Sequence, residues 1–261
     1  MQEIRNRSFT NGIVYALKLA DGAPIEVTDT FLPAYTKNCI NEKTNELKDY
    51  KVGSRDERWM IGVSTMSGCP VRCKFCATGK LKKWRKLTAA EIVAQVEFIL
   101  AKNPNQDPTK SYEFKVNYTR QGEPMLNLEA VREAIEIITK KYPNTHHYVS
   151  TIGIKGMDIS WIKGNITLQV SLHSLDDARR NDLIPYKNKM TIEELGQVRT
   201  ESNLKTTVNM TLVDEKDFDI ELLKKYFDPA KFFIKISPVN INETSEKNGV
   251  GAGIVKAVNL I

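Results

Sequence analysis

The chain has 261 residues, of which 41% are hydrophobic and 27% charged, and its formal net charge is +6. This composition is typical of a soluble globular protein, and no apolar run approaches the roughly 20 residues that span a membrane, which argues against a membrane protein. The first residues lack the basic and then apolar pattern of a signal peptide, so we expect a cytoplasmic protein whose thiols stay reduced.

The first 59 residues are predicted to form an extension to the main domain. Residues 12–33 have the pattern of a β-hairpin that turns at Ala20, Asp21 and Gly22. A polar stretch, residues 34–58, follows it and has no clear periodicity. We therefore divide the chain into an N-terminal β-hairpin extension with a polar stretch, residues 1–59, and a core domain, residues 60–261.

In the core domain, β-branched apolar runs alternate with segments of helical period. The predicted strands are residues 60–65, 114–119, 147–152, 166–173, 206–213 and 232–239. The predicted helices are residues 88–102, 126–142, 191–202 and 219–227. Thr88 and Glu91 have the spacing of a capping box at the start of the first helix. Six strands that alternate with helices predict an α/β fold with a parallel sheet, either open or closed into a partial barrel.

The most informative motif is GCPVRCKFCATG, residues 68–79, which holds three of the four cysteines of the chain. Cys69, Cys73 and Cys76 follow the first predicted strand of the core, where loops of parallel α/β folds carry the chemistry. Their spacing predicts a loop, because residues four and three apart converge only when the backbone wraps around a bound group. A structural zinc site normally has four protein ligands, and no fourth histidine or cysteine lies nearby. A 4Fe–4S cluster on three thiolates would instead leave one iron open to a small molecule. Zinc and inert buried thiols remain the alternatives.

The spacing C-x3-C-x2-C resembles that of the radical S-adenosylmethionine (radical SAM) superfamily. Further stretches are similar to the RlmN/Cfr family of ribosomal RNA adenosine methyltransferases, in unbroken order from about residue 60 to residue 240. They are residues 63–80, 87–96, 122–127, 150–153, 171–185 and 236–240. The resemblance implies a partial six-stranded parallel (βα) barrel with residues 171–185 as a long loop after the fourth strand.

The same resemblance implies two cofactors, a 4Fe–4S cluster on the three cysteines and S-adenosylmethionine beside it. A carboxylate can accept a hydrogen bond from the amino group of S-adenosylmethionine, a glycine allows close approach, and hydroxyls suit its carboxylate or ribose. Read without the resemblance, such residues are ordinary turn formers or caps. The residues implied to bind S-adenosylmethionine are Gly122, Glu123, Ser150, Ser171, His173 and Asn240. Phe75 is expected either to cover the cluster or to pack in the core.

The chain also departs from the family. The family's methylation resembles a relay between two cysteines, one of them seven residues before the first cluster ligand, and that position is Gly62 here. No cysteine occurs after Cys76 in this sequence. Arg120 and Gln121 stand where the family has glycine and methionine, and we expect them to enlarge and charge the wall of the site. We therefore expect an enzyme that cleaves S-adenosylmethionine to a 5′-deoxyadenosyl radical acting on an unidentified substrate, with RNA or a nucleotide as candidate. The alternatives are an RlmN/Cfr-like RNA (adenine) methyltransferase and a noncatalytic cluster-bearing homologue that binds nucleic acid.

Four further features bear on partners and on the N-terminal region. The resemblance implies an electron donor such as flavodoxin or ferredoxin. Residues 80–86 place five basic residues around Trp84, an arrangement that suits a nucleic acid as well as an ordinary solvated loop. Cys39 is expected to be an incidental reduced thiol, and a relay thiol that folds back over the site is the alternative. The parts played by Glu26 and Asp29 in the hairpin are left open, because one carboxylate of this region resembles a proton acceptor of the family.

Overall fold

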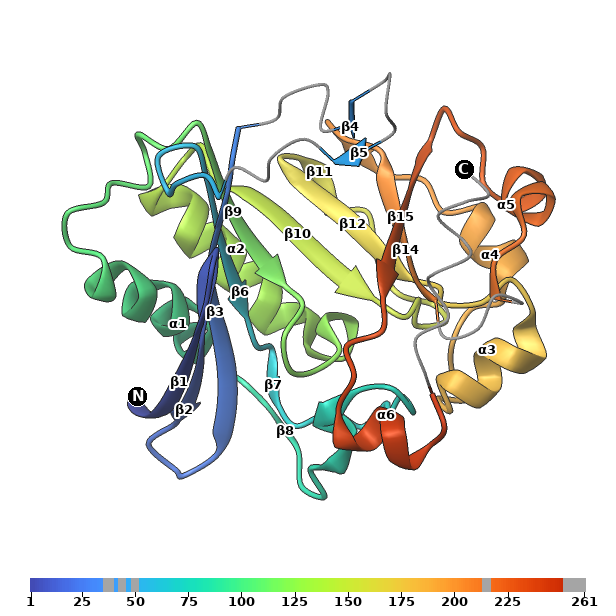
Figure 1. Ribbon diagram of the computed structural model, residues 1–261, viewed down its shortest axis with the longest axis horizontal. Helices are drawn as coiled ribbons and strands as arrows, with labels where there is room; N and C mark the ends of the chain where they lie inside the picture. The colour runs from blue at the N-terminus through green and yellow to red at the C-terminus, as the bar shows by residue number, and fades with distance from the viewer. Residues whose placement is uncertain (35–39, 42–45, 48–51, 213–216, 251–261) are drawn as a thin grey trace.

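A computed structural model describes residues 1–34, 40–41, 46–47, 52–212 and 217–250. Cys39 and residues 251–261 lie outside the described residues. One nine-stranded sheet, in the order β1-β2-β3-β6-β9-β10-β12-β14-β15, forms the centre of the molecule (Figure 1). Its last six strands are parallel to one another. They are β6 (Arg58–Val63), β9 (Glu113–Tyr118), β10 (His146–Thr151), β12 (Ile166–Ser171), β14 (Thr206–Leu212) and β15 (Phe232–Pro238).

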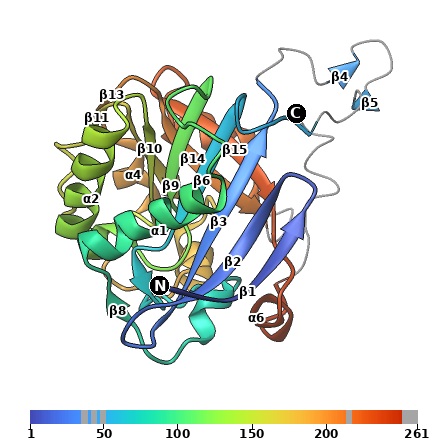
Figure 2. The ribbon, with the colours of Figure 1, turned by 90° about the vertical axis from the view of Figure 1, so that its left-hand side faces the viewer.

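The prediction of six parallel strands is confirmed, with every boundary within two residues of the predicted one. The sheet is extended on one side by three antiparallel strands, β1 (Gln2–Phe9), β2 (Gly12–Lys18) and β3 (Pro24–Leu32), which Figure 2 shows in front. The predicted hairpin is β2 and β3, whereas β1 was not predicted. Its residues are exposed or half-buried throughout, so its sequence has no apolar alternation to detect.

The extension and the core share one sheet, because β3 pairs antiparallel with β6. The predicted domain boundary at residue 59 therefore stays a prediction. The hydrogen bonds of the sheet run without interruption from the extension to the core. Two-residue strands form three small ladders beside the main sheet. They are β4 (Ile40–Asn41) with β5 (Glu46–Leu47), β7 (Met66–Ser67) with β8 (Arg85–Lys86), and β11 (Lys163–Gly164) with β13 (Glu201–Ser202).

The helices agree with the sequence where amphipathic periodicity is strong. Helix α1 (Ala89–Lys102) begins with the predicted capping box of Thr88 and Glu91. Helix α2 (Leu128–Lys141) and helix α5 (Ile220–Tyr226) lie within their predicted ranges. Helix α4 (Ile192–Gly196) is shorter than predicted, since the chain after it continues into β13.

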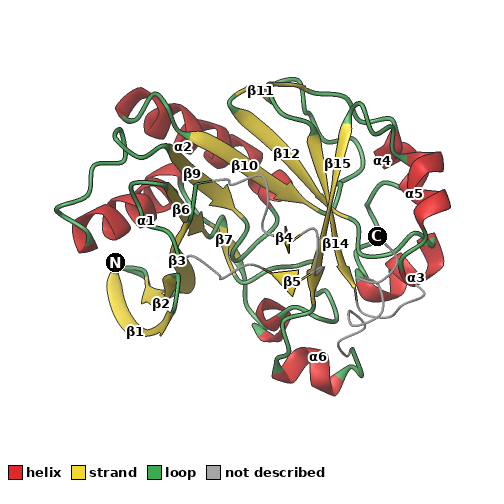
Figure 3. Cartoon of the chain, turned by 45° about the horizontal axis from the view of Figure 1, so that its top comes forward, coloured by secondary structure: helices red, strands yellow, loops and turns green. Residues whose placement is uncertain are grey.

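Two short helices occur where the sequence predicted none. Helix α3 (Asp177–Leu183) lies in the stretch expected to be a long loop, and it begins where the Asp176 side chain accepts a hydrogen bond from the Arg179 amide. Helix α6 (Glu243–Lys247) follows β15, with Asn242 as its capping residue. Two 3-10 turns, η1 (Ala77–Lys80) and η2 (Pro124–Asn127), complete the described elements. Helices α3 and α6 both lie near the carboxyl ends of the parallel strands (Figures 1 and 3).

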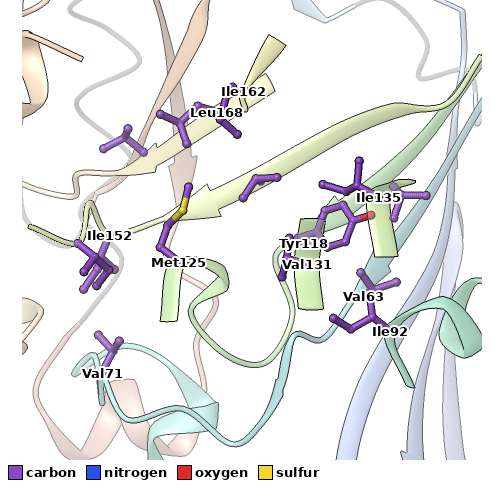
Figure 4. Close-up of a cluster of buried hydrophobic side chains, with 14 of the residues drawn as sticks. Val63, Val71, Ile92, Tyr118, Met125, Val131, Ile135, Ile152, Ile162 and Leu168 are labelled. Atoms are coloured by element: carbon purple, nitrogen blue, oxygen red, sulfur yellow. The ribbon is translucent and has the colours of Figure 1, made fainter. Parts of the chain in front are cut away.

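The hydrophobic core lies largely between the sheet and the helices that cover its outer face. Val63 of β6 lies beside Ile92 of α1, and Tyr118 of β9 lies beside Val131 and Ile135 of α2 (Figure 4). Because side chains alternate along a strand, these residues leave their neighbours free to face the opposite side of the sheet. None of the helices in the described part of the chain combines the length and the apolar character that a membrane crossing requires.

Candidate cofactor site

A cavity of about 180 Å³ opens at the carboxyl ends of the parallel strands, bounded by the loops after β6, β9, β10 and β12. It brings together eight of the nine residues that the sequence singled out. They are Cys69, Cys73, Cys76, Gly122, Glu123, Ser150, Ser171 and His173. The ninth, Asn240, is exposed and does not line this cavity. Residues about a hundred positions apart in the chain thus line one cavity, because parallel strands end at a common edge of the sheet.

The loop that carries the three cysteines, residues 68–79, wraps tightly around the cavity. Gly68 and Arg72 have φ angles of +75° and +57°, the left-handed region that lets a chain turn sharply. A side chain at Gly68 would also lie only 2.5 Å from the Lys83 carbonyl oxygen. The Cys76 amide donates to the Cys73 carbonyl at 3.1 Å, which draws these two cysteines together. The expectation of a wrapped loop is confirmed.

Side chains far away in sequence hold this loop from outside. Asn242 donates through Nδ2 to the Phe75 carbonyl at 3.0 Å, and Asn248 donates to the Lys74 carbonyl at 2.8 Å. On the other side, the Gly68 amide donates to Oε1 of Gln121 at 3.2 Å. Gln121 therefore supports the cysteine loop and does not line the cavity, contrary to our expectation that it alters the wall. No local pattern marked the two asparagines, because their partners lie more than 160 residues earlier.

The thiols lie in an environment that disfavours the free thiolate. Burial raises the pKa of Cys69 to about 12 and that of Cys73 well above its usual value, and the neighbouring thiols add to both shifts. A metal centre would replace the thiol protons, since thiolates are the metal ligands. Within the described residues, no group of three or more histidine, cysteine or acidic side chains is arranged to hold a metal ion. A 4Fe–4S cluster binds each thiolate to a different iron, so the three-thiol mouth of the cavity suits it better than a single ion.

Glu123 places a carboxylate at the inner wall of the cavity. Its side chain is 3% exposed and accepts hydrogen bonds from the backbone amides of Met125 at 3.0 Å and Ile152 at 2.9 Å. Burial raises the pKa of Glu123 to about 7 even though these bonds act in the opposite direction. Gly122 before it has φ +105°, and a side chain there would lie 2.6 Å from Met66 Cγ. These hydrogen bonds therefore fix the orientation of the carboxylate. Because burial disfavours its negative charge, a cation bound beside it would stabilise the ionised form.

Hydroxyls and a neutral imidazole form another part of the wall. The hydroxyls of Ser150 and Ser171 lie 3.4 Å apart at the ends of adjacent strands. His173 has φ +64° and accepts at Nδ1 from the Thr211 amide at 3.0 Å, so its proton belongs on Nε2. Burial lowers the pKa of His173 to about 3. Phe75 packs edge-on against this ring, with 4.8 Å between ring centroids, and it both lines the cavity and contacts the core.

Arg180 is a residue of this region that the sequence did not mark, because its helix was expected to be a loop. Its side chain is fully buried and donates to the carbonyls of Met190 at 2.6 Å and Ile152 at 2.5 Å. Burial lowers the pKa of Arg180 to about 10, against the attraction of Asp177 and Cys73. The guanidinium joins the loop after β10 to the chain before α4 and places a positive charge behind the cysteine loop.

A distant side chain covers Gly62, the residue that the resemblance implies as a relay position. A Cβ on Gly62 would lie 2.4 Å from Thr28 Oγ1 and 3.0 Å from Arg120 Cδ. The stem of Arg120 therefore packs over the glycine, and its guanidinium pairs with Glu26. Arg120 lines the cavity as expected. Glycine at residue 62 is what makes room for it.

The structure separates the two hairpin carboxylates. Glu26 faces the cavity side of the sheet, whereas Asp29 is fully buried on the helix side. Asp29 accepts from Trp59 Nε1 at 2.8 Å, Asn103 Nδ2 at 3.0 Å and Arg55 Nη2 at 2.7 Å, so it joins the extension to α1. This is a structural role.

The basic segment after the cysteine loop is partly neutralised. Arg85 pairs with Asp21 and Glu91, and Lys80 pairs with Glu243. Trp84 is 48% exposed beside these pairs. The segment therefore presents fewer free cations than the sequence indicated.

Comparisons with known proteins agree with this geometry. Residues 63–227 match the model of the radical SAM superfamily. A probable dual-specificity RNA methyltransferase RlmN of Pseudothermotoga lettingae is 30% identical over 239 residues, which cover 87% of this chain and 61% of that protein. One of the same name from Chlorobaculum tepidum is 32% identical over 222 residues, covering 81% of this chain and 59% of that protein. The chain thus spans about 60% of the length of these curated relatives.

A solved structure resembles the whole fold. The crystal structure of a radical SAM methyltransferase from Sphaerobacter thermophilus superposes with a TM-score of 0.73 at 23% identity, covering 99% of this chain and 72% of that one. At this identity the likeness concerns the fold. The match of the superfamily model covers more than half of the chain and includes all three cysteines of the cavity. The chain belongs to the radical SAM superfamily.

Proposed function

We propose that this protein is a radical SAM enzyme that cleaves S-adenosylmethionine reductively and directs the resulting radical at a bound substrate. One observation carries the proposal: three thiols and a buried carboxylate line the same cavity at the ends of four parallel strands. A protein that only binds a partner has no physical need for such a donor set. The fold of a solved radical SAM methyltransferase adds support.

In this proposal Cys69, Cys73 and Cys76 hold a 4Fe–4S cluster and the strand ends hold S-adenosylmethionine. When bound together, these two cofactors supply a one-electron cleavage that yields a 5′-deoxyadenosyl radical. Glu123 accepts from the cofactor's amino group, and Ser150 and Ser171 donate to its oxygens. His173 presents the Nε2–H of a neutral imidazole, and Phe75 and the asparagine-supported cysteine loop keep water away from the irons.

The remaining assignments are part of the same proposal. Asn240 is proposed as a contact of S-adenosylmethionine on the resemblance alone. Its side chain is exposed outside the cavity and would have to turn toward it to make this contact. The electron comes from a donor such as flavodoxin or ferredoxin, and the cytoplasm is the compartment that keeps the thiols reduced. The substrate is RNA or a nucleotide, which the relatives' name, RNA methyltransferase, supports.

RNA methylation itself is a second candidate, favoured by the same name. The packing of Arg120 over Gly62 speaks against a relay that uses a thiol at residue 62. Incubation with methyl-labelled S-adenosylmethionine and RNA, followed by nucleoside mass spectrometry, separates the two. Labelled methyladenosine supports the second candidate, and 5′-deoxyadenosine without labelled nucleoside supports the first alone.

The proposal is tested by anaerobic reconstitution followed by iron and sulfide assay. We expect one 4Fe–4S cluster per chain, its loss when the three cluster cysteines are replaced by alanine, and no loss in Cys39→Ala. Adding S-adenosylmethionine is expected to change the electron paramagnetic resonance spectrum of the reduced cluster. Stoichiometric zinc without sulfide, or a cluster indifferent to S-adenosylmethionine, would contradict the proposal.

A further inference from the structure

A second cavity, of about 530 Å³, adjoins the first and has no role in the proposed cofactor chemistry. It lies on the three antiparallel strands of the extension. Its lining residues are Arg5, Asn6, Arg7, Phe9, Val14, Ala16, Glu26 and Arg120. We call it the outer trough. Its size is within the range of small-molecule sites, roughly 300 to 1,000 Å³. Arg120 lines both cavities, so the outer trough and the cofactor cavity are neighbours that share this side chain.

Strand register explains which side chains form the outer trough. Arg5 pairs with Ala16 and Arg7 pairs with Val14, and directly paired residues of an antiparallel ladder share one face. Ala16 in turn pairs with Glu26. The other face of these strands is covered by α1, where Tyr15 and Phe98 pack edge to face, 5.3 Å apart. The outer trough is therefore the inner face of the extension, continuous with the inside of the barrel.

The rim of the outer trough carries uncompensated positive charge. Arg5 and Arg7 are exposed, and neither forms an ion pair with a carboxylate of the residues that the structure describes. Two residues apart on one strand, their Cα atoms lie about 7 Å from each other. The Arg7 guanidinium lies over the ring of Phe9 at 5.1 Å, and that ring is 50% exposed. Two cations and an open aromatic ring suit a phosphate with an attached planar group.

The floor and the inner end of the outer trough also fit such a ligand. Val14 and Ala16 are small, which leaves the space between the rim and the barrel open. At the inner end Glu26 neutralises Arg120, so no excess negative charge repels an anion there. Ser64 donates to the Glu26 carbonyl at 2.6 Å and accepts from the Gln121 amide at 3.2 Å, which fixes the backbone on both sides of this pair.

We propose that the outer trough binds the phosphate of a phosphate-bearing substrate, with Arg5 and Arg7 on the phosphate and Phe9 against a planar group. The reacting part of that substrate then passes Arg120 into the cofactor cavity. This inference rests on the proposed function for the reaction, but the binding itself does not depend on it. The phosphate comes from a single-stranded nucleic acid or from a free nucleotide.

Equilibrium binding tests the inference without any turnover. The probes are a short fluorescein-labelled single-stranded RNA, followed by anisotropy, and a nucleoside monophosphate, followed by calorimetry, both with cluster-free and cluster-loaded protein. We expect the double variant Arg5→Ala/Arg7→Ala to bind the recognised probe at least tenfold more weakly than the wild type. Loss of the one neutralised phosphate also reduces the salt slope for RNA by about 0.7. Phe9→Ala is expected to weaken it roughly 5- to 100-fold.

A matched control removes the same charge elsewhere. Lys224 and Lys225 lie on α5, beyond the opposite end of the sheet from β1, and Lys224→Ala/Lys225→Ala is expected to bind like the wild type. Arg5→Lys/Arg7→Lys keeps the charge and is expected to recover part of the affinity. Thermal unfolding checks that each variant is folded.

The outcomes separate the two sources and the two proposals. Weakened RNA binding with little response to the monophosphate identifies a nucleic acid strand, and the reverse identifies a free nucleotide. The outer trough is not the site if Arg5→Ala/Arg7→Ala binds both probes as tightly as the wild type. The same conclusion follows if the α5 control loses as much affinity as this double variant. If the trough variants bind the probe as expected but reconstitution of the wild type yields no cluster, only the proposed function is overturned. If the wild type cleaves S-adenosylmethionine but the trough variants bind the probe like the wild type, only this inference is overturned.

Discussion

Replacing Glu123 by glutamine tests the cofactor site from two independent sides. The change keeps the size of a side chain that is 3% exposed and removes its charge. In the folded protein burial raises the pKa of this carboxyl from 4.5 to about 7. The wild-type carboxylate is therefore costly to keep ionised in the empty site, and that cost is what a cationic ligand would relieve.

The pH dependence of stability follows from this shift. Between pH 4.5 and pH 7 the folded chain holds a proton that the unfolded chain has released, so the free energy of unfolding falls as pH rises. At about 1.4 kcal/mol per pH unit the loss reaches about 3 kcal/mol near pH 7 and persists above it. Glu123→Gln lacks this loss. Between pH 5 and pH 8 the difference in unfolding free energy should shift in favour of the variant by about 2 to 3 kcal/mol.

Binding of S-adenosylmethionine should change in the opposite direction. A charge-assisted hydrogen bond contributes roughly 1.5 to 3 kcal/mol, so the variant should bind the cofactor about ten- to a hundredfold more weakly. A variant that loses less stability between pH 5 and pH 8 than the wild type, and that binds its cofactor less well, is the expected signature of a residue kept for function.

Urea unfolding of the apoprotein at pH 5 and pH 8, followed by tryptophan fluorescence, measures the first effect. Calorimetry of S-adenosylmethionine with the cluster-loaded protein measures the second. Glu129→Gln, on the exposed first turn of α2, is the control and should change neither quantity. Equal stability shifts in Glu123→Gln and in the wild type, together with unchanged affinity, would refute the reasoning.

Three further substitutions test the scaffold by urea unfolding. Asp29→Ala leaves the buried Trp59 indole N–H without its acceptor and should lower the unfolding free energy by about 2 to 4 kcal/mol, whereas Asp21→Ala, in an exposed ion pair, should cost less than about 1 kcal/mol; similar losses would contradict the assignment. Burial lowers the pKa of His147 from 6.5 to about 3, so the wild type should lose about 3 kcal/mol between pH 7 and pH 4.5, as the unfolded chain takes up the proton first. His147→Asn should lose that much less over the same interval, and an unchanged profile would count against the shift. Arg180→Met leaves two carbonyls without their donor and should lower the free energy of unfolding by about 3 kcal/mol. Arg180→Lys should recover little of this loss, because an ammonium cannot span both carbonyls. Full recovery of the wild-type stability in Arg180→Lys would argue against the bridging role.

Local sequence patterns were sufficient for the elements that have a strong period or a local cap. The six parallel strands are apolar runs, and α1 begins with Thr88 and Glu91, which bond to each other across one turn. The three cysteines are close in sequence, so their spacing alone predicted a wrapped loop. Their position after the first core strand also predicted the edge of the sheet on which they lie, because parallel strands end at a common edge.

The features that the sequence did not predict either lack an apolar pattern or depend on contacts between distant segments. Strand β1 is exposed on both faces and has no alternation, and it is held by its hydrogen bonds to β2. Asn242 and Asn248 reach the cysteine loop from the far end of the described chain.

Gly62 shows the same division most clearly. The resemblance implies that a thiol is missing at this position, which stays a prediction, and only the tertiary structure showed that Arg120, 58 residues later, packs over the glycine and pairs with Glu26. Periodicity and spacing report what a residue does to its neighbours in the chain. Which side chain fills the space above a glycine is decided by the packing of three strands against one another.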